Sequence, residues 1–445
     1  ALLRGHGACA GPYPGPVTPC PHVWRRVPGV LHRCVTLLLS FALTLTVAVL
    51  ISARARRGVL STTVLFLAVG LALGSGWWGL LDIPDGSPLL YWTTEIGLFA
   101  VLLMDGMHAP RSALREGWRE PARALAIGLP LSVVFGFALA LALLDLPWSE
   151  ALLLAAALAP TDPLLAEAII GRESVPWRVR HTLNVESGFN DGLALPLVLL
   201  LLPLAGSGGE DVWAVLGHLA EGVAIGAVVP AVLIRLERTA VFGASERYRI
   251  LGIVALGLLV FGVASAVDAN LFVAAFTAGI TIGTLAPEAP GRFEQTGQAV
   301  TELLKLGAVF LVGAVLARHL VDTAGWTAWV VGALMLVAGP PASVAIAMPG
   351  SPPRGDERLA VAWFGPKGFA SVLYSLLILR SGVPFAGELF GVATLTIGLS
   401  IVAHSSTDVL VARRIGRPRE SERTGRVGRA CDGRRQGGVA DDDHR

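Results

Sequence analysis

Apolar residues fill most of the chain in blocks of about 20, and short polar segments separate the blocks. A helix needs roughly 20 apolar residues to cross the hydrocarbon core of a bilayer, which is about 30 Å thick. The pattern therefore predicts an all-α polytopic membrane protein with about 13 transmembrane helices. The predicted spans are approximately 36–52, 59–78, 92–107, 124–144, 149–170, 181–204, 214–234, 250–267, 270–285, 302–317, 325–348, 359–379 and 389–411.

The two ends of the chain differ from the apolar blocks. Residues 1–35 contain several prolines and arginines, and we expect an N-terminal extension without fixed structure. Residues 36–411 form the transmembrane domain. Residues 412–445 are rich in Arg, Gly and Asp, which predicts a short disordered tail in the cytoplasm.

Composition supports a membrane protein and argues against several other classes. Hydrophobic residues make up 53% of the 445 positions and charged residues only 15%, whereas soluble domains carry about 25% charged residues. The net charge of +2 does not suggest a nucleic-acid partner. The four cysteines form no C-x-x-C pair, so neither a zinc site nor a disulfide framework is predicted. No cofactor is expected.

Arginine is distributed unevenly between the predicted loops. The loops after odd-numbered spans hold 17 arginines and the alternate loops hold two, Arg318 and Arg380. Positively charged loops stay in the cytoplasm. The prediction is a protein of the plasma (inner) membrane with its N-terminus outside and its C-terminus in the cytoplasm.

Two carboxylates stand in successive spans, where a membrane protein normally avoids them. Asp162 follows the apolar run 151–160, and Asp191 precedes the apolar run 193–204. A charged Asp at bilayer depth costs roughly 2.5–3.5 kcal/mol on insertion scales, so such residues usually mark an ion path or a proton relay. Asp191 and Asp162 are therefore predicted to bind a cation and a proton.

Neighbouring oxygen donors extend this predicted site. Ser187 is four residues before Asp191 and three before Asn190, so the three side chains lie close together on one helix. Thr161 precedes Asp162 and adds a hydroxyl. Pro163 removes a backbone donor and breaks the helix, and Pro160 adds a second break. The unwound segment frees carbonyls of the kind that discontinuous transporter helices offer to cations.

A second break is predicted around Lys367, one of only two lysines in the chain. Gly365, Pro366 and Gly368 interrupt an otherwise apolar span around it. A buried cation needs a counter-ion. Glu186 is its predicted partner, in an ion pair with a structural role. His404, in the last span, is expected to be a hydrogen-bonded packing residue.

Together these motifs resemble the monovalent cation:proton antiporter-1 family, the NhaP-like sodium/proton antiporters, over residues 36–412. The motifs are Thr161-Asp162-Pro163, Glu186-Ser187-Gly188-Phe189-Asn190-Asp191-Gly192 and Trp363-Phe364-Gly365-Pro366-Lys367-Gly368-Phe369-Ala370-Ser371. The resemblance implies an inverted-repeat fold with discontinuous helices, a six-helix transport bundle beside a dimerisation domain, and a homodimer. It implies that Asp191 is the carboxylate shared by cation and proton, with Asp162, Thr161 and Ser187 as partners.

Two positions refine what the resemblance implies. Members with Asn before the carboxylate, as Asn190 stands before Asp191, tend to be electroneutral. The family usually has Arg where this chain has Lys367, which leaves open whether the lysine itself titrates.

The predicted function is secondary antiport of Na⁺, or of Li⁺ or K⁺, against H⁺ by alternating access, in pH homeostasis rather than enzymatic catalysis. A K⁺/H⁺ antiporter with the same site is the alternative. A cation channel would need a selectivity filter of repeated backbone carbonyls or a ring of acidic side chains, and the sequence shows no motif for either. An intramembrane hydrolase would need a motif such as H-E-x-x-H, which is absent. A sensor that does not transport ions would lack the carboxylate pair.

Overall fold

The computed structural model describes residues 27–55, 61–108, 123–161, 177–206, 211–239, 245–322, 325–339, 363 and 365–415. Asp162 and Pro163 lie outside these ranges, as do residues 1–26 and 416–445. Glu186 and Ser187 lie on a described helix, but their side chains are not among the described ones.

Within the described residues the chain is helical, with one isolated β-bridge between Gly74 and Leu81. Each predicted span overlaps at least one helix. The helices are α1 (Val27–Ala55), α2 (Thr62–Leu73), α3 (Pro88–His108), the π-helix η2 (Ala124–Gly128), α5 (Leu129–Leu143), α6 (Trp148–Ala157), α8 (Trp177–Leu204), α9 (Val212–Glu237), α10 (Glu246–Ala266), α11 (Leu271–Leu285), α12 (Ala289–Asp322), α13 (Trp326–Val337), α16 (Phe369–Arg380) and α17 (Ala386–Ile415).

Six of the helical segments among these residues are long and apolar enough to cross a bilayer, and further apolar helices of 10–17 residues pack among them. The chain is therefore a multi-pass membrane protein, as predicted. Two helices begin well before their predicted spans. α1 begins at Val27, inside the segment assigned to an extension, and α12 begins 13 residues before the predicted start at 302.

The division between the eighth and ninth spans is confirmed. α10 ends at Ala266 and α11 begins at Leu271. Asp268 between them has a positive φ of 55°, which ends the helix. The side chain of Asn270 accepts a hydrogen bond from the Val273 amide at 2.9 Å and so caps α11.

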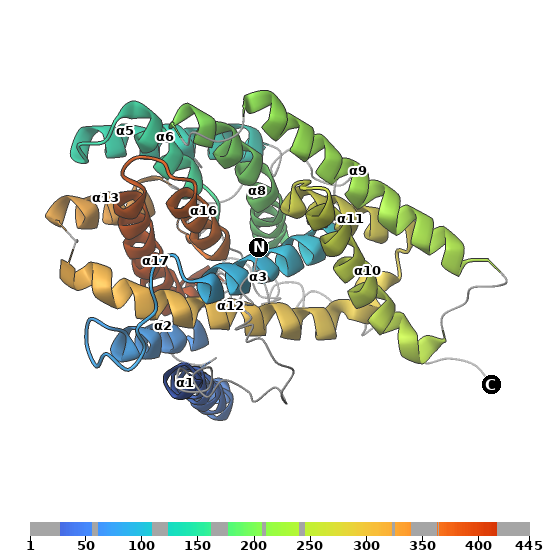
Figure 1. Cartoon of the computed structure of the whole chain (residues 1–445), viewed down its shortest axis with the longest axis horizontal. Helices are drawn as coiled ribbons and strands as arrows, with labels where there is room; N and C mark the ends of the chain where they lie inside the picture. Colours follow the sequence, from blue (N-terminus) through green and yellow to red (C-terminus); the bar gives the residue numbers. More distant parts are fainter. Residues whose placement is uncertain are drawn as a thin grey trace, which may run out of the picture.

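Small residues let the central helices pack closely. In Figure 1, α3 and α11 meet near the middle of the molecule, above the long helix α12. A methyl group on Gly106 of α3 would overlap the Phe276 carbonyl oxygen of α11, and one on Gly279 of α11 would overlap the Leu103 carbonyl oxygen of α3. Close backbone approach at glycine is a common way to associate helices in a membrane.

Contacts at one end of the helices agree with the prediction from the arginines that successive loops alternate between the two sides of the membrane. Arg318, at the end of α12, lies 2.7 Å from the carboxylate of Asp82 in the connection between α2 and α3. His319 Nε2 lies 3.2 Å from Asp85 Oδ2 in the same connection. The loops after the second and tenth spans therefore lie on the same side of the molecule, as an even number of crossings between them requires.

Candidate functional site

The first predicted helix break lies at the end of α6. The helix ends at Ala157, and residues 159–161 have no regular structure. Pro160 cannot donate a backbone hydrogen bond and hinders the continuation of the helix. Ala159 and Pro160 are buried, so the break lies inside the protein rather than in an exposed loop. Pro163, the other residue predicted to break this helix, is outside the described residues.

The second predicted break lies before α16. Gly365, Pro366, Lys367 and Gly368 are non-helical and buried, and α16 begins at Phe369. Both discontinuities that the sequence predicts are therefore present. Their common cause is a cluster of proline or glycine in an apolar segment, where a helix would otherwise continue.

Lys367 connects the two breaks. Its side chain is 2% exposed, and Nζ donates a hydrogen bond to the Ala159 carbonyl at 3.0 Å. Ala159 follows the C-terminal end of α6, where carbonyl groups lack helical partners and the helix dipole is negative. A buried ammonium is favourable there. The predicted ion pair with Glu186 stays a prediction, because that carboxylate is outside the described side chains.

Asn190 holds the first break from the neighbouring helix α8. Its Oδ1 accepts a hydrogen bond from the Thr161 amide at 3.1 Å, and its Nδ2 donates to Thr161 Oγ1 at 2.8 Å. The Asn190 side chain is 2% exposed. The Asn190 amide thus binds the backbone amide and the hydroxyl of Thr161, and it fixes the residue that precedes Asp162.

Asp191 follows directly on α8 and is 4% exposed. Its backbone carbonyl accepts a hydrogen bond from the Tyr374 hydroxyl of α16 at 2.6 Å. Tyr374 is completely buried. The structure therefore brings Thr161, Asn190, Asp191 and Lys367 into one connected region, in which α6, α8 and α16 meet. That Ser187 and Asp162 also bind the cation stays a prediction, because their side chains are outside the described ones.

Sequence reasoning missed three residues that hold this region, namely Tyr374, Ser400 and the Ala159 carbonyl. Ser400 and His404 are both 0% exposed. His404 is hydrogen-bonded inside the protein, as expected of a packing residue, but its partners belong to the second break. A signal was present in the sequence: Ser400 and His404 are polar residues four apart in an apolar span, and so share a helix face.

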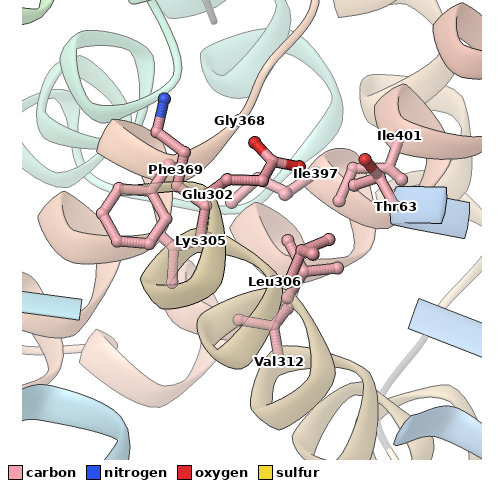
Figure 2. Close-up of a pocket in the computed structure, with 11 residues that line it drawn as sticks. Thr63, Glu302, Lys305, Leu306, Val312, Gly368, Phe369, Ile397 and Ile401 are labelled. Carbon is pink, nitrogen blue, oxygen red and sulfur yellow. The ribbon is translucent and has the colours of Figure 1, made fainter. Parts of the chain in front are cut away.

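A separate pocket lies behind the second break (Figure 2). Glu302 and Lys305 of α12 line it together with Thr63, Gly368 and Phe369. Figure 2 shows these polar groups among apolar side chains, with Leu306, Val312, Ile397 and Ile401 around them. None of the predicted cation ligands that the structure describes lines this pocket, so the candidate site remains the junction of the two breaks.

Comparison with known proteins places these features in a family. The family model described as "Sodium/hydrogen exchanger, transmembrane" matches residues 41–413. The K⁺/H⁺ antiporter NhaP2 of Shewanella oneidensis is 24% identical over 386 residues, which are 84% of this chain and 66% of that protein. The K⁺/H⁺ antiporter NhaP of Alkalimonas amylolytica is 26% identical over the same shares of the two chains. The chain thus spans about two thirds of the length of these relatives.

The fold is also similar to a solved structure. The sodium proton antiporter MjNhaP1 from Methanocaldococcus jannaschii at pH 8 superposes with a TM-score of 0.70 at 18% identity. The superposition covers 87% of this chain and 100% of that one. At this identity the likeness establishes the fold, and it confirms the antiporter architecture that the sequence predicts.

Proposed function

This chain belongs to the family of transmembrane sodium/hydrogen exchangers, and on that premise we propose that it is a secondary active antiporter that exchanges a monovalent cation for H⁺. The observation that carries the proposal is the junction of two broken helices beside a buried carboxylate. Lys367 Nζ donates a hydrogen bond to the Ala159 carbonyl. Asn190, the residue directly before Asp191, is hydrogen-bonded to Thr161. Unwound helices at such junctions supply the ion sites of many secondary transporters.

The proposed mechanism needs one carboxylate with two competing ligands. Asp191, supported by Asp162, Thr161 and Ser187, binds either a cation or a proton. The Lys367 ammonium and the Asn190 amide stabilise the breaks on either side. Because the carboxylate releases one ligand before it takes the other, alternating access to the two sides of the membrane couples the two fluxes. With Asn190 instead of a second carboxylate at that position, we propose electroneutral exchange.

Na⁺ is the proposed cation, and K⁺ is the second candidate. The solved structure with a similar fold is that of a sodium proton antiporter, whereas the two relatives described above are K⁺/H⁺ antiporters. Both cations bind through hard oxygen donors. The residues that form the site support either choice, so selectivity must be measured.

We further propose that the protein is a homodimer of the plasma (inner) membrane, with its N-terminus outside and its C-terminus in the cytoplasm, and that it contributes to pH homeostasis. The 17 arginines in loops after odd-numbered spans, against two in the others, support this orientation. The dimer rests on the family resemblance, and size-exclusion chromatography with light scattering would test it.

Transport in sealed vesicles tests the proposed function. The purified chain is reconstituted with an imposed pH gradient, and Na⁺, Li⁺ or K⁺ is added outside while a dye reports the internal pH. We expect at least one cation to dissipate the gradient and Asp191→Asn to abolish the effect, because an amide cannot exchange a proton for a cation.

The control is Asp211→Asn, which changes a carboxylate at the exposed start of α9. It should transport like the parent. Robust exchange in Asp191→Asn would remove Asp191 from the mechanism. A folded parent that transports none of the three cations would contradict the proposed function.

A further inference from the structure

The second helix break interrupts one particular backbone hydrogen bond. In an α-helix the amide of each residue donates to the carbonyl four residues earlier. If the helix continued through the break, the Lys367 amide would donate to the Trp363 carbonyl. The unwound backbone separates the two groups. The Lys367 amide is buried and needs another acceptor, while the Trp363 carbonyl accepts from the Gly365 amide at 3.0 Å and has a second lone pair for a further donor.

Two side chains of α17 supply those partners. Ser400 Oγ accepts a hydrogen bond from the Lys367 amide at 2.6 Å. His404 Nε2 lies 3.0 Å from the Trp363 carbonyl oxygen, and His404 Nδ1 lies 3.2 Å from Ser400 Oγ. Ser400 and His404 are four residues apart, so they lie one turn apart on the same face of α17.

The bond from the Lys367 amide has a fixed direction, and one tautomer of His404 continues it to the Trp363 carbonyl. The Lys367 amide can only donate, so Ser400 Oγ accepts from it and has its own proton free for His404 Nδ1. The ring then carries its proton on Nε2 and donates it to the Trp363 carbonyl. Nδ1 also lies 3.0 Å from the Ser400 carbonyl, to which the opposite tautomer would donate, but that tautomer would place the Nε2 lone pair against the Trp363 carbonyl and leave the link between the two residues of the break unmade. A neutral ring also avoids placing a charge on a side chain with 0% exposure.

We propose that Ser400 and His404 are positioning residues that replace the missing helical hydrogen bond and hold the second break open. The chain of donors runs from the Lys367 amide through Ser400 and His404 to the Trp363 carbonyl. It connects the same two backbone groups that a continuous helix would join directly. Trp363 is held at its side chain as well, because its Nε1 donates to Thr407 Oγ1 of α17 at 2.9 Å.

The consequence for the site is the position of Lys367. With its amide fixed on α17, its side chain extends to the Ala159 carbonyl of the first break, 3.0 Å from Nζ. Loss of the Ser400–His404 pair would let residues 363–368 move toward helical geometry and withdraw the ammonium from that carbonyl. This effect on transport rests on the proposed function, whereas the hydrogen bonding of the backbone does not.

Hydrogen–deuterium exchange, measured by mass spectrometry on the full chain in lipid nanodiscs, tests the structural part. The variants are Ser400→Ala and His404→Phe. The His404 ring lies 5.2 Å from the Trp363 ring between centroids, and phenylalanine keeps an aromatic ring at that position. We expect the exchange rate in peptides covering residues 363–368 to rise about tenfold in both variants. Ser400→Ala removes the acceptor of the Lys367 amide, and His404→Phe removes the ring nitrogen beside the Ser400 hydroxyl.

Two further variants make the result specific. Ser375→Ala is the matched control, since Ser375 is 1% exposed and its hydroxyl donates only within its own helix, to the Val372 carbonyl. Its exchange at 363–368 should equal that of the parent. His404→Gln retains an N–H donor for the Trp363 carbonyl and should restore most of the protection.

Transport by the same variants gives the second readout. We expect Ser400→Ala and His404→Phe to lower turnover about tenfold, while His404→Gln and Ser375→Ala stay near the parent. Unchanged exchange in both Ser400→Ala and His404→Phe would overturn the proposal, as would an equal rise in Ser375→Ala. If exchange rises as expected in a chain that transports no cation, the backbone role stands and the proposed function fails.

Discussion

Replacing Asn190 by Ala removes two hydrogen bonds between α8 and the first helix break. In the structure the Asn190 amide accepts from the Thr161 amide at 3.1 Å and donates to Thr161 Oγ1 at 2.8 Å. Hydrogen bonds between helices in membrane proteins average about 0.6 kcal/mol and reach about 1.7 kcal/mol, so two of them correspond to about 1–3 kcal/mol. We expect Asn190→Ala to lower the free energy of unfolding by that amount.

A double-mutant cycle separates the two bonds. Thr161→Val removes the hydroxyl but keeps the backbone amide, so it cuts only the bond from Asn190 Nδ2. The coupling energy between Asn190→Ala and Thr161→Val should be about 0.6–1.7 kcal/mol. The assay is equilibrium unfolding of the purified protein in mixed micelles, titrated with a denaturing detergent and followed by the loss of helical circular dichroism.

Asn270→Ala provides the comparison for this experiment. Asn270 also binds a backbone amide, that of Val273, but it caps α11 away from the junction. It should lose about 1 kcal/mol of stability and leave cation-driven proton flux unchanged, whereas Asn190→Ala should slow that flux. A coupling energy of zero, or equal transport in the two Asn variants, would refute the assignment of Asn190 to the break.

Three further predictions follow from the same structure. Lys367→Met should lower the free energy of unfolding by about 1.5–3 kcal/mol, because the Ala159 carbonyl loses a charged donor. Lys367→Arg keeps a charged donor and should lower the free energy of unfolding by less. Detergent unfolding measures both variants. Gly106→Ala should lower the free energy of unfolding by about 1–3 kcal/mol because the added methyl overlaps α11. Gly252→Ala, where the methyl would meet no atom outside its own stretch of helix within 4 Å, should be neutral or stabilising in the same assay. Addition of the transported cation should raise the melting temperature more at alkaline than at acid pH, since protons compete for the carboxylate, and Asp191→Asn should remove this dependence.

The sequence by itself determined that the chain is a multi-pass helical membrane protein, and it located the helices of the described residues in their order. Hydrophobic block length and loop arginine depend only on the bilayer and on the local chain, so spans, alternation and the division at Asp268 could be read directly. Proline and glycine act on their own backbone, which is why both helix breaks were predictable at Pro160 and at 365–368. The family motifs added the identity of the candidate carboxylates.

Only the tertiary structure decided which groups satisfy the two breaks. Lys367 reaches the Ala159 carbonyl across 208 positions of the chain, and His404 reaches the Trp363 carbonyl across 41. Every residue has a backbone carbonyl, so the sequence does not show which one serves as a partner. A polar residue in an apolar span likewise does not show which distant group it contacts. Burial supplies the physical reason for these contacts, because each backbone group released by a break must find a partner inside the protein, and the fold determines which one is near.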